Sequence, residues 1–125
     1  MRNQVLIGAF AVLGTAVLLG AALFILHLRP GAAAAPWPLA ALHGLLGLCG
    51  LGCLLLALRN SPLRPDHGTA SFGVISAVLI AVAALVGGGI FAVRLANSGR
   101  AGTLIGVHAI LAVSGFVILA AYVLV

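Results

Sequence analysis

Residues 37–58 read W-P-L-A-A-L-H-G-L-L-G-L-C-G-L-G-C-L-L-L-A-L, and this stretch decides the fold class of the chain. Apart from two cysteines, His43 is its only ionisable residue. As a helix, the stretch is long enough to cross the roughly 30 Å hydrocarbon core of a bilayer, which takes about 20 residues. Three further stretches have the same character. The sequence therefore predicts four transmembrane helices, over residues 4–28, 37–58, 70–95 and 101–125.

Composition leaves no room for a separate soluble domain. Of the 125 residues, 64% are hydrophobic and 6% are charged, whereas soluble domains carry roughly 25% charged residues. We expect a single membrane domain over residues 1–125, surrounded by membrane lipids. The net charge of +5 comes from arginines distributed over the turns, with Asp66 as the only acid. These arginines form no basic face, so we expect no nucleic-acid partner.

The turns between the predicted helices are short, and short turns place consecutive helices side by side in opposite directions. The expected fold is therefore all-α, a transmembrane up-down-up-down four-helix bundle. The two halves also resemble each other. Gly20 and Phe24 align with Gly87 and Phe91, and His43 aligns with His108 once a turn two residues shorter is allowed for. This alignment predicts an internal repeat of two helical hairpins.

The strongest part of the repeat surrounds the two histidines. From His43 the chain reads H-G-L-L-G-L-C-G-L, and from His108 it reads H-A-I-L-A-V-S-G-F. His43 lies five residues after Pro38 and His108 lies five after Thr103, which places both roughly 8 Å inside the membrane from the same side. Ionisable groups at that depth are costly and rare. A pair at matching depth indicates a common partner.

Bundle geometry suggests what this partner is. The second and fourth helices lie on a diagonal, and neighbours 8–10 Å apart put that diagonal at roughly 13 Å. We expect this gap to be too wide for contact between the imidazoles and suited to a flat metal macrocycle. We also expect each ring N–H to donate to a carbonyl one turn earlier, near Leu39 and Leu104. Small residues on the histidine faces predict a slot for the macrocycle: Gly47, Gly50, Ala112 and Gly115.

One haem b per chain, with His43 and His108 as metal ligands, is the leading hypothesis. The alternatives are histidines that only hydrogen-bond to neighbouring helices, a copper or zinc site, and a magnesium tetrapyrrole. The small residues also suit close helix packing alone. Haem propionates would need cations at the headgroup level, where ordinary interfacial anchoring is the other explanation for each arginine. The candidates on that side are Arg29, Arg94 and Arg100, with His27 as an interfacial group or a further ligand.

These features resemble the small transmembrane b-type cytochromes of the membrane cytochrome b superfamily, four-helix bundles that hold haem with histidines on different helices. The resemblance covers the architecture and the two histidines with their small-residue faces. It implies electron transfer, as a subunit or anchor of a membrane oxidoreductase rather than a stand-alone enzyme, with a partner membrane subunit or redox protein and with quinol as a conceivable reductant. Many members hold two haems. Here His67, in the opposite loop, is the only histidine on the other side, which limits the chain to one.

Two other classes of function remain open. A small transporter or channel is one, although coupled exporters need an intramembrane carboxylate and the predicted helices contain none. A cofactor-free structural subunit of a membrane complex is the other, with oligomerisation through glycine-rich surfaces. No nucleophile, base and orienting group converge for hydrolysis. Cys49 and Cys53 are expected to be buried free thiols.

Arginine counts do not fix the orientation, because three arginines lie on each side of the membrane. The free amino terminus favours both chain ends in the cytoplasm, and an inverted or dual topology is the alternative. The abundance of alanine and glycine and the lack of lysine are typical of a GC-rich bacterial genome, so we expect a multi-pass protein of a bacterial inner membrane.

Overall fold

The computed structural model describes residues 2–31, 36–60, 69–96 and 101–124. It contains four helices: α1 (Arg2–Leu28), α2 (Trp37–Arg59), α3 (Thr69–Leu95) and α4 (Gly102–Leu124). The all-α class is confirmed, and the predicted helix limits agree with the structure to within two residues. All four helices are long and apolar enough to cross a membrane. The chain is a multi-pass membrane protein.

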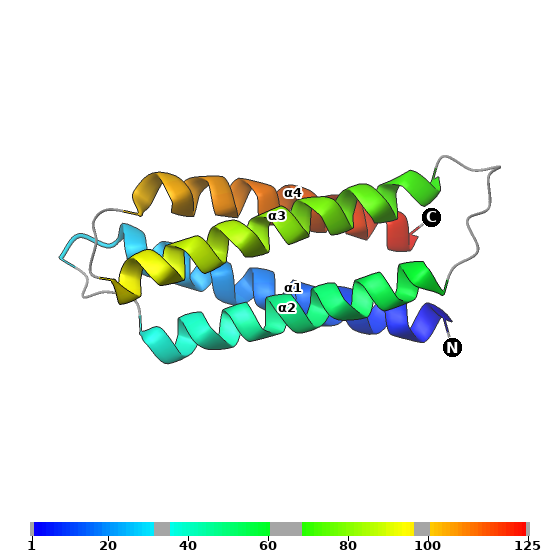
Figure 1. The fold of residues 1–125 in the computed structure, drawn as a ribbon, viewed down its shortest axis with the longest axis horizontal. Helices are drawn as coiled ribbons and strands as arrows, with labels where there is room; N and C mark the ends of the chain where they lie inside the picture. Colours follow the sequence, from blue (N-terminus) through cyan, green and yellow to red (C-terminus); the bar gives the residue numbers. More distant parts are fainter. Residues whose placement is uncertain (1, 32–35, 61–68, 97–100, 125) are drawn as a thin grey trace.

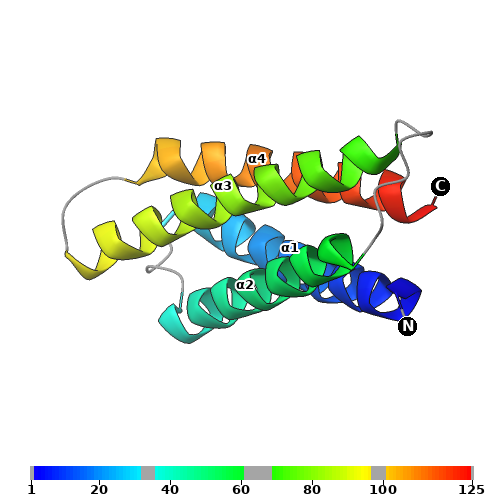
Figure 2. The same cartoon turned by 45° about the vertical axis from the view of Figure 1, so that its right-hand side comes forward.

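Consecutive helices run in opposite directions, and both chain termini lie at the same end of the molecule (Figure 1). Each helix packs on two others in the cyclic order α1, α2, α3, α4, so α2 and α4 lie on a diagonal. The closest packing is within the pairs α1–α2 and α3–α4. In both ribbon views α4 lies above α2, and α1 and α3 cross between them (Figure 2).

Local sequence explains where the first hairpin turns. Gly31 adopts a φ of 72°, a left-handed conformation that glycine takes without steric cost, shortly after the end of α1. Pro36 is the residue before α2, and Pro38 lies in its first turn. Proline suits a first turn because the amide hydrogen that it lacks would have no acceptor inside the helix.

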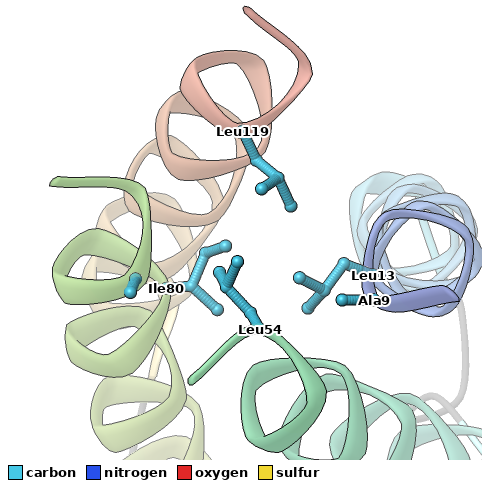
Figure 3. Packing of buried hydrophobic residues seen from close by; sticks show 6 residues of the cluster. Ala9, Leu13, Leu54, Ile80 and Leu119 are labelled. Carbon is cyan, nitrogen blue, oxygen red and sulfur yellow. The ribbon is translucent and has the colours of Figure 1, made fainter. Parts of the chain in front are cut away.

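The apolar core lies in the half of the bundle that carries the termini. Leu54 of α2 and Leu119 of α4 are fully buried there. They meet Leu13 of α1 and Ile80 of α3, so all four helices contribute to one cluster (Figure 3). Phe10 and Phe116 stack next to it with ring centroids 5.0 Å apart. This packing joins the two hairpins and leaves the other half of the bundle for the histidines.

The two hairpins make equivalent contacts, as the predicted repeat requires. Leu13 packs on Gly50 in the first hairpin, and Ile80 packs on Gly115 in the second. The offset is 67 residues between α1 and α3 and 65 between α2 and α4, as in the sequence alignment. One difference is that Ser76, fully buried, donates a 2.8 Å hydrogen bond to the Gly115 carbonyl, whereas Ala9 stands at the corresponding place in α1.

Candidate site at the facing histidines

His43 and His108 face each other in the half of the bundle away from the termini. Each is the seventh residue of its helix, counted from Trp37 in α2 and from Gly102 in α4. Their ring centroids are 5.8 Å apart, and the ring planes are inclined by 84°. Both side chains are half-buried. The bundle therefore brings together the two residues that the sequence singles out.

The expected gap between the imidazoles is wrong. The diagonal of roughly 13 Å applies to helix axes. An imidazole extends several ångströms from its own axis, so two facing side chains occupy most of that distance. Two imidazoles that bind one metal ion from opposite sides, with metal–nitrogen bonds of about 2 Å, have ring centres roughly 6 Å apart. The observed separation of 5.8 Å is close to this value.

Each ring is held by a carbonyl of the neighbouring helix in the same hairpin. His43 Nδ1 lies 2.8 Å from the Ala16 carbonyl of α1, and His108 Nδ1 lies 2.8 Å from the Ala83 carbonyl of α3. The expected acceptors near Leu39 and Leu104, in the histidines' own helices, are therefore wrong. The carbonyls near Leu39 and Leu104 lie in the first turns of α2 and α4. The rings do not reach back to them but extend sideways to the adjacent helix of the hairpin.

These hydrogen bonds determine which ring nitrogen is available. A carbonyl oxygen can only accept, so each Nδ1 carries a proton and donates it. In the neutral imidazole, Nε2 then holds the lone pair and can act as a metal ligand. Histidine ligands in metalloproteins are oriented in this way, with the second ring nitrogen donating to a carbonyl or carboxylate. Two neutral imidazoles with Nε2 lone pairs are a donor set that a metal centre can take from a protein.

The predicted slot is only partly present. An ideal Cβ built on Gly50 would lie 2.6 Å from Leu13 Cγ, and one built on Gly115 would lie 2.8 Å from Ile80 Cγ1. At these two positions the absence of a side chain serves close packing with the adjacent helix, and the slot is closed. Gly47 differs, because a Cβ there would meet no atom within 4 Å. Ala112, also half-buried, is the remaining member of the set.

Two glycines with a direct role escaped the sequence analysis. The His43 ring packs on Gly20 of α1, and the His108 ring packs on Gly87 of α3. Each glycine follows the carbonyl that accepts the histidine's hydrogen bond by four residues. The signal was present as A-x-x-x-G at aligned positions, 16–20 and 83–87. The acceptor is a backbone carbonyl, however, and no residue type identifies it. The sequence therefore shows that these positions repeat but not that they contact the histidines.

The other polar candidates lie farther from the pair or outside the described residues. Arg29 and His27 are exposed near the end of α1, and Arg94 is half-buried near the end of α3. Arg100 and His67 fall outside the residues that the structure describes. Cys49 is exposed, so the expectation of a buried thiol is wrong there, and Cys53 is half-buried. Cys49 lies on the outer surface of α2, which in a membrane faces lipid or a partner.

Only a few kinds of metal site need no more than two ligands from the protein. Within the described ranges, no three residues of the His, Cys, Asp or Glu types gather where they could hold an ion. Structural zinc takes four protein ligands and catalytic zinc takes three. A metal that already has four equatorial ligands in a macrocycle needs only two from the protein.

A groove of about 500 Å³ lies beside the pair, between α1 and α4. It is lined by Phe24 and by a face of α4 that includes Gly106, Ile110 and Val113. Ser114 supplies its one hydroxyl group. Neither histidine lines the groove, so it is distinct from the expected slot.

No family model, curated protein or solved structure matches this chain. The assignment of a function therefore depends on the geometry of His43, His108 and the groups that hold them.

Proposed function

We propose that this chain is a haem b-binding membrane protein that acts in electron transfer, in which His43 and His108 would bind the iron of one haem. The observation that carries the proposal is the paired geometry. Two imidazoles from diagonal helices lie 5.8 Å apart, and each is oriented by a 2.8 Å hydrogen bond to a backbone carbonyl. This arrangement leaves one lone pair per ring for a shared metal.

A haem held by two histidines would supply one-electron transfer at iron and would have no open site for oxygen or another ligand. The chain's own groups then have three tasks. The carbonyls of Ala16 and Ala83 keep the proton on Nδ1 and the lone pair on Nε2. The four helices half-bury the rings and so limit the access of water to them. Arg29 and Arg94 lie at the same end of the bundle as the histidines, near the ends of α1 and α3, and would bind the haem propionates.

A single haem near one face of the membrane does not span the bilayer. Electrons would have to reach or leave it through a second component, so the chain acts in this proposal as a subunit or anchor of a membrane oxidoreductase. Its partner is a membrane subunit or redox protein, and quinol is a candidate donor. We place it in the inner membrane of a bacterium.

The hydrogen bonds of the histidines also favour a second candidate. His43 ties α2 to α1 and His108 ties α4 to α3, which by itself would stabilise each hairpin in lipid. In that case the chain is a cofactor-free structural subunit. A purely structural role does not explain why the two rings approach each other across the diagonal.

Pigment distinguishes the two candidates. The full chain, expressed in bacterial membranes with added haem precursor and purified in detergent, should show a Soret band and sharp visible bands on reduction. Pyridine extraction should give one haem b per chain. His43→Ala and His108→Ala should each lose most of the pigment, whereas His27→Ala, which removes an exposed histidine on the same side, should keep it.

Metal analysis of the same samples covers the remaining alternatives. Colourless protein without metal would favour the structural subunit, and colourless protein with stoichiometric copper or zinc would assign a bare-metal site. A magnesium tetrapyrrole would be recognised by its own absorption and by the absence of iron. Full haem content in both ligand variants would refute the assignment of the ligands.

A further inference from the structure

Each imidazole of the pair rests on a glycine of the adjacent helix. An ideal Cβ on Gly20 would lie 2.9 Å from His43 Cε1, and one on Gly87 would lie 3.0 Å from His108 Cε1. Real Cβ atoms essentially never lie closer than 3.0 Å to such a neighbour, as at Gly20, and a distance of 3.0 Å, as at Gly87, is tighter than nine in ten real contacts. With any side chain at these two positions, the ring would have to move.

The position of the glycines explains why they are required. In an α-helix the Cα–Cβ bond tilts toward the N-terminus, so a side chain covers the turn that precedes its own Cα. A side chain at position 20 would therefore overhang the carbonyl of Ala16, and one at position 87 would overhang that of Ala83. Glycine leaves these carbonyls open on one side, and the histidine ring enters there.

Two contacts then determine how each ring is turned. Nδ1 is fixed by its carbonyl, 2.8 Å away, and Cε1 lies against the backbone of the glycine. Rotation of the ring about its Cβ–Cγ bond would lengthen the hydrogen bond or press the ring into the helix. Because both hairpins hold their ring in the same way, the angle between the two planes follows from how the hairpins are packed. That angle is 84°.

We propose that Gly20 and Gly87 are positioning residues that hold the imidazole planes of His43 and His108 nearly perpendicular, and so set the electronic ground state of the iron between them. The inference rests on the proposed function. It adds a property that haem binding alone does not require, since two histidines can bind iron with their planes at any angle.

The consequence is spectroscopic. An imidazole raises the energy of the one iron dπ orbital that overlaps its π system. Parallel rings raise the same orbital and split the dπ pair, whereas perpendicular rings raise one orbital each and leave the pair nearly degenerate. A ferric low-spin iron with a nearly degenerate pair has large orbital angular momentum. It therefore gives an electron paramagnetic resonance signal of strong anisotropy, with its lowest-field g value well above that of parallel-ring complexes.

The test is the ferric spectrum of the purified full chain, compared with Gly20→Ala and Gly87→Ala. Gly8→Ala in α1 and Gly88→Ala in α3 are matched controls, because a Cβ at either position meets nothing within 4 Å. We expect the strongly anisotropic signal in the unmodified chain and in both controls. In the two test variants, the lowest-field g value of the bound haem should fall toward the parallel-ring value.

The outcomes separate this inference from the proposal on which it rests. Absence of haem from the unmodified chain overturns both. If the unmodified chain binds haem with a parallel-ring signal, only the inference is overturned. The inference is also overturned if both test variants bind haem and give the same signal as the unmodified chain. If the test variants bind no haem, an unchanged melting temperature of the haem-free protein supports a positioning role, and a lowered one assigns the glycines to helix packing and overturns it.

Discussion

Glycine serves two purposes in this chain, and the neighbour at each position distinguishes them. Gly20 and Gly87 make room for the imidazole rings, whereas Gly50 and Gly115 make room for Leu13 and Ile80 of the adjacent helix. All four lie on inward-facing parts of their helices. Small residues at helix interfaces in lipid let backbones approach closely. In this chain the approach at Gly50 and Gly115 serves helix packing, and the approach at Gly20 and Gly87 serves the histidine site.

Gly115→Ala should destabilise the α3–α4 hairpin without altering the ligand pair. The new Cβ would lie 2.8 Å from Ile80 Cγ1 and 3.3 Å from the Ile80 backbone nitrogen, so relief requires backbone movement. Overpacking of this kind costs about 1–3 kcal/mol. The measurement is the melting temperature in detergent, with Gly52→Ala, whose Cβ meets nothing within 4 Å, as the control. Loss of haem at an unchanged melting temperature would instead indicate that the slot reaches this position.

At the scale of the elements, the hairpin is the unit that prepares each ligand. The hydrogen bond of His43 lies within α1–α2, and that of His108 lies within α3–α4. The buried bond from Ser76 to Gly115 also stays within one hairpin. Contacts between the hairpins are apolar, through the Phe10–Phe116 stack and the leucine cluster. Each half therefore carries one oriented imidazole, and the complete site forms where the halves meet.

A chain divided after Asn60 should reassemble when both halves are co-expressed. The cut falls between the hairpins, so every hydrogen bond of the histidines stays within a fragment. Co-purification of an untagged half with a tagged half, together with the return of pigment, would show reassembly. Replacing His43 or His108 by Ala in its own half should abolish the pigment and leave co-purification intact. Failure of the unmodified halves to associate would mean that the connection, rather than the apolar interface, holds the bundle together.

The whole molecule divides its tasks along the bundle axis. Leu13, Leu54, Ile80 and Leu119 meet in the half that carries the termini (Figure 3). The histidines meet in the other half. Substitutions in the half with the termini should therefore mainly lower stability, and substitutions at the histidines should mainly lower haem content.

Leu54→Ala should lower the stability of the protein and leave the site intact. Truncation of a buried leucine costs 2–5 kcal/mol in water, and we expect about 2 kcal/mol here because lipid tails replace water as the competing surroundings. His43→Ala in the haem-free protein removes one hydrogen bond, worth about 0.6 kcal/mol in a membrane. Unfolding in detergent and haem per folded chain measure the two effects. Equal losses of stability in both variants would contradict the division of the bundle into an apolar core half and a histidine half.

Much of the site follows from the sequence, and its errors have identifiable causes. His43 and His108 stand out because an imidazole in an apolar helix is conspicuous, and their alignment predicts equal depth. The spacing of the rings was overestimated because a helix-axis distance does not include the reach of the side chains. The acceptors were misplaced because the carbonyls of Ala16 and Ala83 look like all others in the sequence. Gly50 and Gly115 were assigned to the slot because a small residue does not show which neighbour it admits.

The sequence by itself determined four apolar helices, their order, the repeat and the level of the two histidines, because length and hydropathy act locally and lipid offers a backbone no alternative to helix. Only the tertiary structure decided which way the rings turn, which carbonyls hold them and which glycines serve them. Those features depend on contacts between residues 25 or 27 positions apart within a hairpin, and on the meeting of two hairpins across the bundle.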